Sequence, residues 1–379
     1  MKQDIEYDVA IVGGGLAGLA LSIQLAKQGY KIVVFEKERY PFHKVCGEYI
    51  SLECRDFLHV LGIDTGKMNL PFIQNLQVSA PNGKILKHKL PLGGFGVSRY
   101  LLDQQLATIA VREGAMLMEN CKVEDVLFAG DCFRVQTTME PFKARVVCGS
   151  FGKKSNLDIK WKRAFAIADK NKLNNYIGVK YHIKTNFPID TIALHNFDNG
   201  YCGIVSVEDA RYNLCYLTTA SNLRRCGNNI QQMEKEILCK NPHLDKIFSE
   251  SKFLFPAPLV ISQISFDQKS QVEQHMLMIG DAAGMITPLC GNGMSMALHG
   301  SKLAAEQVHH FLKGNINRAH MESSYSAAWK SHFSGRLKMG RRFQRIFANP
   351  RLMSQVIGIA RAFPVIVDPL IRKTHGQPF

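Results

Sequence analysis

The chain has 379 residues, of which 46% are hydrophobic and 21% are charged, a balance that excludes disordered, collagen-like and disulfide-scaffold proteins. Its length favours two closely packed domains over a single core. Lysine and arginine together number 47 against 32 acidic residues, so the net charge of +15 predicts an anionic partner: a phosphate-bearing cofactor, an anionic membrane surface or nucleic acid.

Ten cysteines are scattered without any Cys-x-x-Cys pair, so we predict no metal site, and the thiols suit a reducing cytoplasm. Residues 9–26 carry no charge, but the acidic residues before them and the glycines within them argue against a signal or spanning segment. We therefore expect a cytoplasmic protein, with peripheral attachment at the inner face of the membrane as a further expectation.

The N-terminal region begins with an apolar, β-branched run at 7–12 that leads directly into Gly13-x-Gly15-x-x-Gly18. Helix-forming residues follow, and then a second apolar run at 31–35. Strand, glycine turn, helix and strand in this order predict a dinucleotide site on a parallel sheet.

Each glycine of this motif has a distinct expected role. Gly13 permits the tight turn, Gly15 lets the backbone approach a pyrophosphate at the helix N-terminus, and Gly18 lets helix and strand pack closely. Glu36 ends the second strand and is expected to hydrogen-bond an adenosine ribose. Because an acid there disfavours a 2′-phosphate, FAD or NAD is expected rather than NADP.

The middle of the chain reads as a second sheet. Alternating or apolar stretches at 176–183, 201–207 and 212–220 predict strands, and 198–200 (Asp-Asn-Gly) predicts a turn. The segment 222–250 is expected to be rich in helices that close off this sheet.

A second glycine-rich motif follows a predicted strand at 276–280 and precedes a helix that runs to about residue 312. Asp281 suits a hydroxyl of a sugar chain beside a phosphate, or it is simply a helix N-cap. Gly291 and Gly293 would let backbone amides approach a planar ring. A nucleotide contacted by both ends of so long a chain must be extended, which favours FAD.

The segment 330–379 carries ten lysine or arginine residues against one acid, Asp368, with apolar residues interleaved. This pattern suits a helical surface that lies on anionic lipid. It equally suits a helical cap over a substrate cavity, and the two interpretations are compatible. No nucleic-acid module is recognisable, so no nucleic-acid partner is expected.

The chain resembles the flavoprotein superfamily that holds aromatic hydroxylases, flavin-dependent halogenases and geranylgeranyl reductases. Four stretches carry the resemblance: the glycine motif, PFHKVCGEYIS (41–51), VSRYLLDQQLATIA (97–110) and GDAAGMITPLCGNGMSMALHGSKLAAE (280–306). The second and fourth are most similar to the geranylgeranyl reductase branch.

The resemblance implies a mixed α/β fold, with an FAD-binding Rossmann-like domain on a parallel sheet interleaved with a substrate domain on a large mixed β-sheet, and a helical C-terminus. The predicted FAD-binding domain comprises 1–70, 99–165 and 271–329, and the substrate domain comprises 71–98 and 166–270. Residues 330–379 form the basic, apolar C-terminal helices.

The chain also departs from its apparent relatives. Phe151 stands where related hydroxylases carry an aspartate that is tied to FAD and NADPH, which weakens the case for NADPH-reducible hydroxylation. Gly284 stands where hydroxylases often carry histidine. The paired tryptophans of halogenases are absent, because Trp161 and Trp329 are far apart, so halogenation is disfavoured.

The motifs and the resemblance together predict a set of cofactor-binding residues, with Arg99 near the phosphates and ribityl chain as part of a pattern shared with Asp103. The set is Gly13, Gly15, Leu16, Ala17, Gly18, Glu36, Lys37, Cys46, Gly47, Arg99, Val123, Gly280, Asp281, Gly291, Gly293 and Met294.

The predicted activity is hydride transfer from reduced FAD to a carbon–carbon double bond of a large apolar substrate, in the manner of geranylgeranyl reductases. The alternative is a monooxygenase that hydroxylates an aromatic, polyketide or polyene substrate through a flavin C4a-hydroperoxide. A second alternative is a flavin-binding pathway component without turnover.

Two side chains are candidates for direct chemistry. The resemblance places Cys46 near the flavin ring, where it could donate a proton or act only as a small buried hydrophobe. Glu48 is either a nearby acid or a surface carboxylate. His43 and Lys44 could approach a phosphate or the anionic head of a substrate, or be solvated.

The expected partners follow from these assignments. They are a large apolar or carrier-bound small molecule, an anionic membrane surface, and either transient NAD(P)H or a separate electron-donor protein. A tightly bound NAD(P)H is not expected, because the chain contains no second Rossmann motif.

Overall fold

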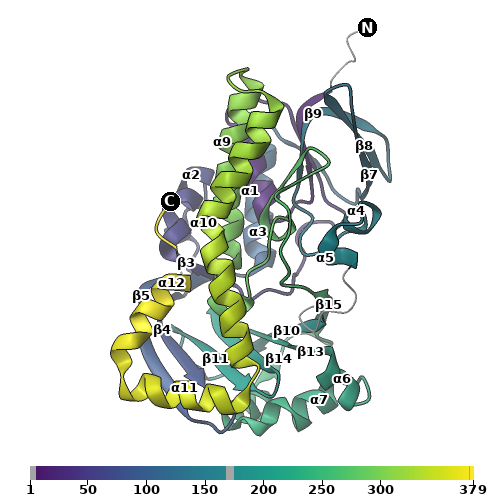
Figure 1. Ribbon diagram of the computed structural model, residues 1–379. Helices are drawn as coiled ribbons and strands as arrows, with labels where there is room; N and C mark the ends of the chain where they lie inside the picture. The colour runs from purple at the N-terminus through teal and green to yellow at the C-terminus, as the bar shows by residue number, and fades with distance from the viewer. Residues whose placement is uncertain (1–5, 168–174, 375) are drawn as a thin grey trace.

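Two β-sheets and their covering helices organise residues 6–167, 175–374 and 376–379, the part of the chain that the computed structural model describes (Figure 1). The first sheet contains β1 (Tyr7–Val12), β2 (Ile32–Phe35), β6 (Met116–Met118), β7 (Val123–Ala129), β8 (Cys132–Thr137), β9 (Phe142–Gly149), β16 (Val272–Glu273) and β17 (Met276–Met278). The second sheet contains β3 (Tyr49–Ser51), β4 (Phe72–Ser79), β5 (Ile85–Gly96), β10 (Tyr176–Lys184), β11 (Thr191–Phe197), β12 (Gly200–Val207), β13 (Arg211–Thr219), β14 (Lys252–Phe253) and β15 (Leu259–Ile264).

The helices are distributed over both sheets and the C-terminal segment. They are α1 (Leu16–Ala26), α2 (Arg55–Leu61), α3 (Arg99–Arg112), α4 (Asn156–Lys160), α5 (Ala164–Ile167), α6 (Ala220–Arg225), α7 (Ile230–Glu236), α8 (Pro242–Glu250), α9 (Gly293–Leu312), α10 (Arg318–Phe347), α11 (Pro350–Ala362) and α12 (Val367–Thr374).

The first sheet has a parallel centre, in the order β16-β17-β9-β1-β2-β6. β1 lies between β2 and β9 and is parallel to both, and β17 is parallel to β9. The apolar composition of β1 and β2 follows from this position, because a central parallel strand is covered on both faces. The predicted strands at 7–12 and 31–35 are therefore confirmed.

The second sheet is mixed, in the order β14-β10-β13-β12-β11-β4-β5-β3 with β15 beside β10. The predicted strands β10, β12 and β13 are confirmed, and so is the turn before β12, where Asn199 has a φ of +57°. One face of the sheet packs its apolar side chains against α6, α7 and α8, as the helix-rich segment predicts.

The opposite face of the second sheet carries a different apolar cluster, which we call the inner apolar face. Its members come from four parts of the chain: Tyr176, Leu194, Tyr201, Leu217, Ile261, Ile264, Phe266, Met285, Leu289 and Phe347. Met285 and Leu289 belong to the second glycine motif, so this face of the sheet meets that motif directly.

Two of the predicted domain boundaries disagree with the structure, one with the pairing of the strands and the other with the extent of α10. β3 falls within the predicted first segment of the FAD-binding domain, yet it pairs with β5 of the second sheet. The boundary after residue 329 falls inside α10, a single helix of 30 residues. Trp329 is buried in the middle of this helix against Gly284 and Gly300, which explains why the helix does not break there.

The C-terminal helices wrap the second sheet. α10 descends from the first sheet to the second, α11 crosses β5 and β11, and α12 returns beside β5 (Figure 1). Among the described helices, none alone is long and apolar enough to cross a membrane. The segments Pro350–Ala362 and Pro364–Arg372 pass that test as a pair, but they are bent by 111° relative to each other.

Candidate active site

The first glycine motif forms the turn between β1 and α1 in the predicted way. Gly13 has a φ of +104°, and a Cβ there would lie 2.5 Å from the carbonyl oxygen of Ser150. A Cβ at Gly18 would collide with the carbonyl oxygen of Gly13, so helix and strand approach too closely for any side chain. Both glycines are therefore required by the fold itself.

Other glycines of the two motifs have free space where a side chain would stand. A Cβ at Gly15, the N-cap of α1, has Ser150 O at 3.7 Å as its nearest neighbour. At Gly293 the nearest atom is 3.9 Å away, and at Gly47 nothing lies within 4 Å. Because the protein does not fill these positions, they suit the close approach of a nucleotide and a ring, and the residues present fit FAD.

Gly291 is explained differently from the prediction. It has a φ of +66°, and a Cβ there would lie 3.0 Å from the ring of Tyr49. Glycine is therefore needed at this position because of the backbone conformation and because a side chain would crowd the ring of Tyr49. Gly280 is similar, with a φ of +58° and only 3.1 Å between its Cβ position and Ala17.

The contact of Gly280 with Ala17 brings the two ends of the chain together. Ala17 is in the first turn of α1, and Gly280 begins the loop after β17. The expectation that both motifs serve one extended ligand is consistent with this contact. Leu16 is buried beside Ala17, and Met294 is buried in the first turn of α9.

Glu36 lies at the end of β2, directly under the first motif. One carboxylate oxygen accepts a hydrogen bond from the Gly14 amide at 3.1 Å, and the other accepts one from the Glu38 amide at 3.1 Å. The Tyr40 hydroxyl donates to the Gly14 carbonyl and closes this side of the turn. These hydrogen bonds fix the Glu36 carboxylate beside the first motif, and its contact with a ribose remains a prediction.

The loop after β17 is fixed by three side chains that sequence reasoning missed. Lys269 Nζ donates to the Asp281 carbonyl at 2.8 Å, Arg163 Nη2 to the Ala282 carbonyl at 3.2 Å, and Gln271 Nε2 to the Ala283 carbonyl at 3.1 Å. Burial lowers the pKa of Lys269 to about 8. Three consecutive carbonyls are therefore held in one orientation.

Asp281 itself is not a helix N-cap, because the N-cap of α9 is Asn292. The alternative interpretation of Asp281 as a cap is wrong for this reason. Burial raises the pKa of the Asp281 carboxyl, although Lys269 and Arg99 oppose this effect. A buried carboxyl next to a glycine-lined loop suits a hydroxyl-bearing ligand.

Arg99 and Asp103 form a bidentate ion pair in the first turns of α3. Arg99 Nε and Nη2 both lie 2.7 Å from the two oxygens of Asp103, and Lys44 Nζ lies 3.0 Å from one of them. Burial would raise the pKa of Asp103, but the charges of Arg99 and Lys44 outweigh it, so its pKa lies below the ordinary range. Lys44 is thus paired within the protein, which differs from a solvated lysine.

A buried network surrounds Glu48, and the sequence indicates Glu48 but not its partners. Glu48, Lys180 and His182 are all buried, with Lys180 Nζ at 2.5 Å from Glu48 Oε1 and His182 Nε2 at 2.7 Å from Glu48 Oε2. The interpretation of Glu48 as a surface carboxylate is wrong. Burial opposes its ionisation, but Lys180 and His182 outweigh that effect and lower its pKa.

This network fixes the loop that carries Cys46. Lys180 Nζ donates to the Lys44 carbonyl at 3.1 Å, and Asn213 Nδ2 donates to the Cys46 carbonyl at 3.1 Å. The amide of Arg99 donates to Glu48 at 2.8 Å. Because Glu48 is ionised and its oxygens are occupied by donors, the geometry favours a positioning role over proton donation.

His43 lies beside this network, stacked on Tyr100 and packed against Phe255. Burial and the neighbouring charge of Lys180 lower the pKa of His43 to about 4, so it is neutral at pH 7. Among the described side chains, Nδ1 of His43, Nδ1 of His182 and Oδ1 of Asn213 are buried without a hydrogen-bond partner. These atoms could bind a polar group of a ligand.

Cys46 is partly exposed, and burial raises the pKa of its thiol. It therefore carries its proton at neutral pH, which suits a proton donor better than a nucleophile. We expect iodoacetamide to alkylate Cys46 slowly at neutral pH and faster only as the pH rises above 9, the ordinary value. Peptide mapping by mass spectrometry would measure this rate, with the urea-unfolded chain as the control. Equal rates in the folded and unfolded chains at neutral pH would contradict a raised pKa.

Two of the predicted cofactor residues, Lys37 and Val123, make no side-chain contact with these groups. The side chain of Lys37 is 66% exposed and pairs with Glu38. Val123 is buried at the start of β7 among core residues. Neither has a contact in the structure that marks it as functional.

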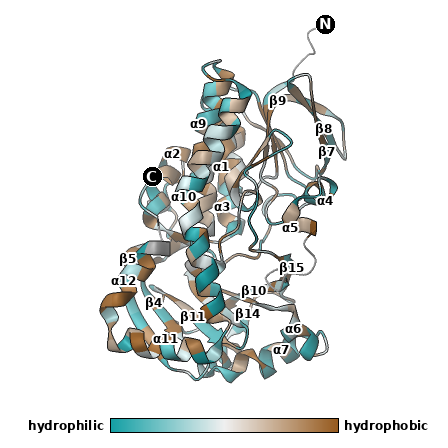
Figure 2. Ribbon diagram, in the orientation of Figure 1, coloured by the Kyte–Doolittle hydropathy of each residue, from teal (hydrophilic) through white to brown (hydrophobic). Residues whose placement is uncertain are grey.

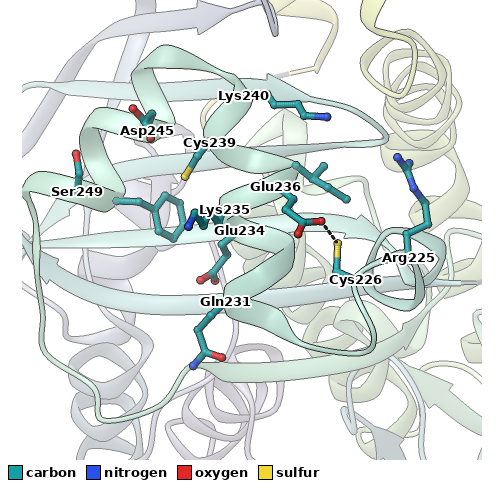
Figure 3. A pocket seen from close by; sticks show the side chains of 12 residues that line it. Arg225, Cys226, Gln231, Glu234, Lys235, Glu236, Cys239, Lys240, Asp245 and Ser249 are labelled. Carbon is teal, nitrogen blue, oxygen red and sulfur yellow. Dashed lines mark hydrogen bonds between the residues drawn. The ribbon is translucent and has the colours of Figure 1, made fainter.

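An open groove of about 840 Å³ lies elsewhere, on the outer side of α6, α7 and α8 (Figure 3). Its lining mixes Arg225, Lys235 and Lys240 with Glu236 and Asp245, and Cys226 points toward Glu236. The second sheet separates these helices from the inner apolar face. The groove is therefore not part of the candidate active site.

Comparisons with known proteins agree with the fold. Residues 11–45 match the family model described as NAD(P)-binding Rossmann-like domain. The chain is 29% identical over 334 residues to conditioned medium factor receptor 1 of Dictyostelium discoideum, covering 79% of this chain and 62% of that protein. It is 23% identical over 342 residues to digeranylgeranylglycerophospholipid reductase of Methanococcus vannielii, covering 86% and 82%.

Among solved structures, the flavin-dependent brominase Bmp2 superposes with a TM-score of 0.78 at 18% identity, covering 97% of this chain and 93% of that one. This likeness confirms the predicted fold class. The chain spans 62% of the length of the Dictyostelium relative, which is less than two thirds.

Proposed function

We propose that the chain is an FAD-dependent oxidoreductase and that it reduces a carbon–carbon double bond in a large apolar substrate. Reduced FAD would supply the hydride, and a proton from the protein or from water would complete the addition. The substrate thereby gains two hydrogens, and the flavin is oxidised by two electrons.

One observation carries this proposal: polarity changes along a single face of β10. Tyr176 belongs to the inner apolar face, a Cβ at Gly178 would lie 3.3 Å from Val45 of the Cys46 loop, and Lys180 and His182 bind Glu48. The Cys46 loop therefore lies between an apolar surface and an ionic network. An apolar substrate chain bound on the apolar surface, with the protonated Cys46 thiol beside it, suits the addition of hydrogen across a double bond.

The second motif contributes apolar side chains to the same region. Met285 and Leu289 extend the inner apolar face toward Gly291 and Gly293. Side chains of this kind exclude water from the reacting carbons and provide contact area for a long hydrocarbon. The electrons would come from transiently bound NAD(P)H or from a separate donor protein.

Hydroxylation of an aromatic or polyene substrate is the competing function, and the same apolar face would serve it. The fold also resembles that of the flavin-dependent brominase Bmp2. The three reactions differ in their products, so one experiment separates them.

We expect the FAD-loaded protein, reduced with dithionite and then freed of excess dithionite, to add two hydrogens to one double bond of a geranylgeranyl lipid for each reduced FAD, in the absence of oxygen. Mass spectrometry of the lipid and the return of oxidised-flavin absorbance would measure this. Met285→Trp, which obstructs the inner apolar face, should lower turnover at least about tenfold with FAD still bound. Met139→Trp, at an exposed site on the first sheet, should not.

Other outcomes overturn the proposal. A product that gains one oxygen atom, formed only in aerated buffer, would assign hydroxylation. A halogenated aromatic product formed with bromide would assign halogenation. Absence of every product with a flavin that cycles no faster than free FAD would assign a component without turnover.

A further inference from the structure

We infer that the bent helix pair α11–α12 docks the protein on an anionic membrane surface. The inference concerns a part of the molecule that the proposed reaction does not use, so either can fail without the other. It rests on which side chains of residues 350–372 face the protein and which do not.

α11 has apolar residues on two sides. On its inner face Met353, Ile357 and Ala360 are buried, and the first two pack against Val78 and Ala80 of the second sheet and the loop after β4. This contact holds the helix on the protein and leaves its opposite side free.

The exposed side of α11 carries apolar residues next to the polar Arg351 and Gln355. Leu352 and Ile359 are seven residues apart and share one side of the helix, and Phe363 directly follows its last residue. All three are exposed, with Phe363 at 64%. A helix that needs only its inner face for folding would normally carry polar residues here.

The apolar surface continues around the bend. Val365 is 84% exposed, and Ile366 and Leu370 are exposed as well. Among the described residues, six of the seventeen exposed large hydrophobic side chains fall within 352–370. The apolar patches on α11 and α12 can be followed in Figure 2. Clusters of this kind on a monomer mark interaction sites, whereas single exposed residues do not.

The charges around this surface select its partner. Arg351, Arg361 and Arg372 are exposed in the same segment, and Arg342 and Arg345 are exposed near the end of α10. The one acid of the segment, Asp368, is paired with His88 at 2.6 Å. Basic groups beside exposed apolar side chains match the acyl and headgroup layers of an anionic bilayer.

A second copy of the chain suits this surface less well. It would bring the same arginines to the same place, and each copy carries a net charge of +15. Crossing the bilayer is also unsuited, because the two segments are bent by 111° and the inner face of α11 stays on the sheet. The geometry therefore suits shallow insertion of the bend between α11 and α12 into the interfacial layer of the membrane.

The test is sedimentation of the full chain, loaded with FAD, with vesicles of phosphatidylcholine with or without phosphatidylglycerol. We expect binding to the anionic vesicles that weakens as salt is added. Phe363→Ser with Val365→Ser should lower the affinity at least about tenfold. The matched control is Val60→Ser with Ile189→Ser, two side chains that are 64% and 58% exposed elsewhere, and it should bind as the wild type does.

A second variant separates charge from apolar contact. Arg351→Gln with Arg361→Gln should weaken binding to anionic vesicles and leave the weak binding to neutral ones unchanged. Equal binding by the Phe363/Val365 variant and the control, or no sedimentation of the wild type, would overturn the inference. Loss of a dimer in the Phe363/Val365 variant, seen by light scattering without lipid, would assign the surface to self-association. The flavin spectrum of each variant checks folding.

Discussion

Lys180→Met is expected to lower the free energy of unfolding by about 3–5 kcal/mol, the usual range for breaking a buried ion pair by removing one partner. Methionine fills a similar volume, but it leaves the ionised Glu48 with only His182 and the Arg99 amide as donors. The Lys44 carbonyl also loses its donor. Urea denaturation of the FAD-free chain would measure the change.

Two comparisons test the assignment to this ion pair. Lys246→Met removes an exposed pair with Glu250 and should cost less than about 1 kcal/mol. Adding Glu48→Gln to Lys180→Met should cost less than the sum of the single variants, because no unpaired buried charge remains. Additive losses would contradict a direct pair.

The pH dependence has a definite sign. The folded-state pKa of Glu48 lies below its ordinary value of 4.5, so its stabilising contribution is present above that pH and is lost as the pH falls through the folded pKa. The difference between the wild type and Lys180→Met should therefore shrink below pH 4.5. A difference that grows on acidification would show that Glu48 is not the ionised partner.

Gly15→Ala is expected to lower the affinity for FAD by about a hundredfold while leaving the FAD-free fold nearly intact. Gly15 has a φ of −77°, and its Cβ position meets only Ser150 O at 3.7 Å, so alanine fits the protein. The methyl group would instead occupy the N-terminus of α1, where the pyrophosphate must approach. Fluorescence titration with FAD and urea denaturation would measure the two effects.

Gly13→Ala supplies the contrast at a distance of two residues. With a φ of +104° and a Cβ position 2.5 Å from Ser150 O, it should impair folding itself. If Gly15→Ala bound FAD as tightly as the wild type, the pyrophosphate would not lie at this helix terminus. The position assigned to the cofactor would then be wrong.

The sequence allowed the local parts of the structure to be predicted. β1, α1 and β2 follow from glycine spacing and apolar runs within thirty residues, and β10, β12 and β13 follow from their alternation. Gly15, Gly47 and Gly293 could be selected because a motif fixes each one relative to its neighbours. Their open Cβ positions agree with the roles expected of them.

The long-range parts could not be predicted. Lys180 and His182 stand at alternate positions of an apolar strand, a signal that both share one face, but their partner Glu48 is 132 and 134 residues away. The same holds for Arg163, which reaches across 119 residues to the Ala282 carbonyl. Only the folded chain shows which buried carboxylate or carbonyl each cation meets.

The order of the strands of the two sheets along the sequence has a consequence for folding during translation. β4 pairs with β11, so Asn75 meets Thr191 only after the segment between them, which contains β6 to β9 of the first sheet, has been made. Until that segment leaves the ribosome, one edge of the β4–β5 hairpin has no partner and exposes ladder groups to other nascent chains. Folding should accordingly be slow and chaperone-dependent, and chains released before β11 should aggregate.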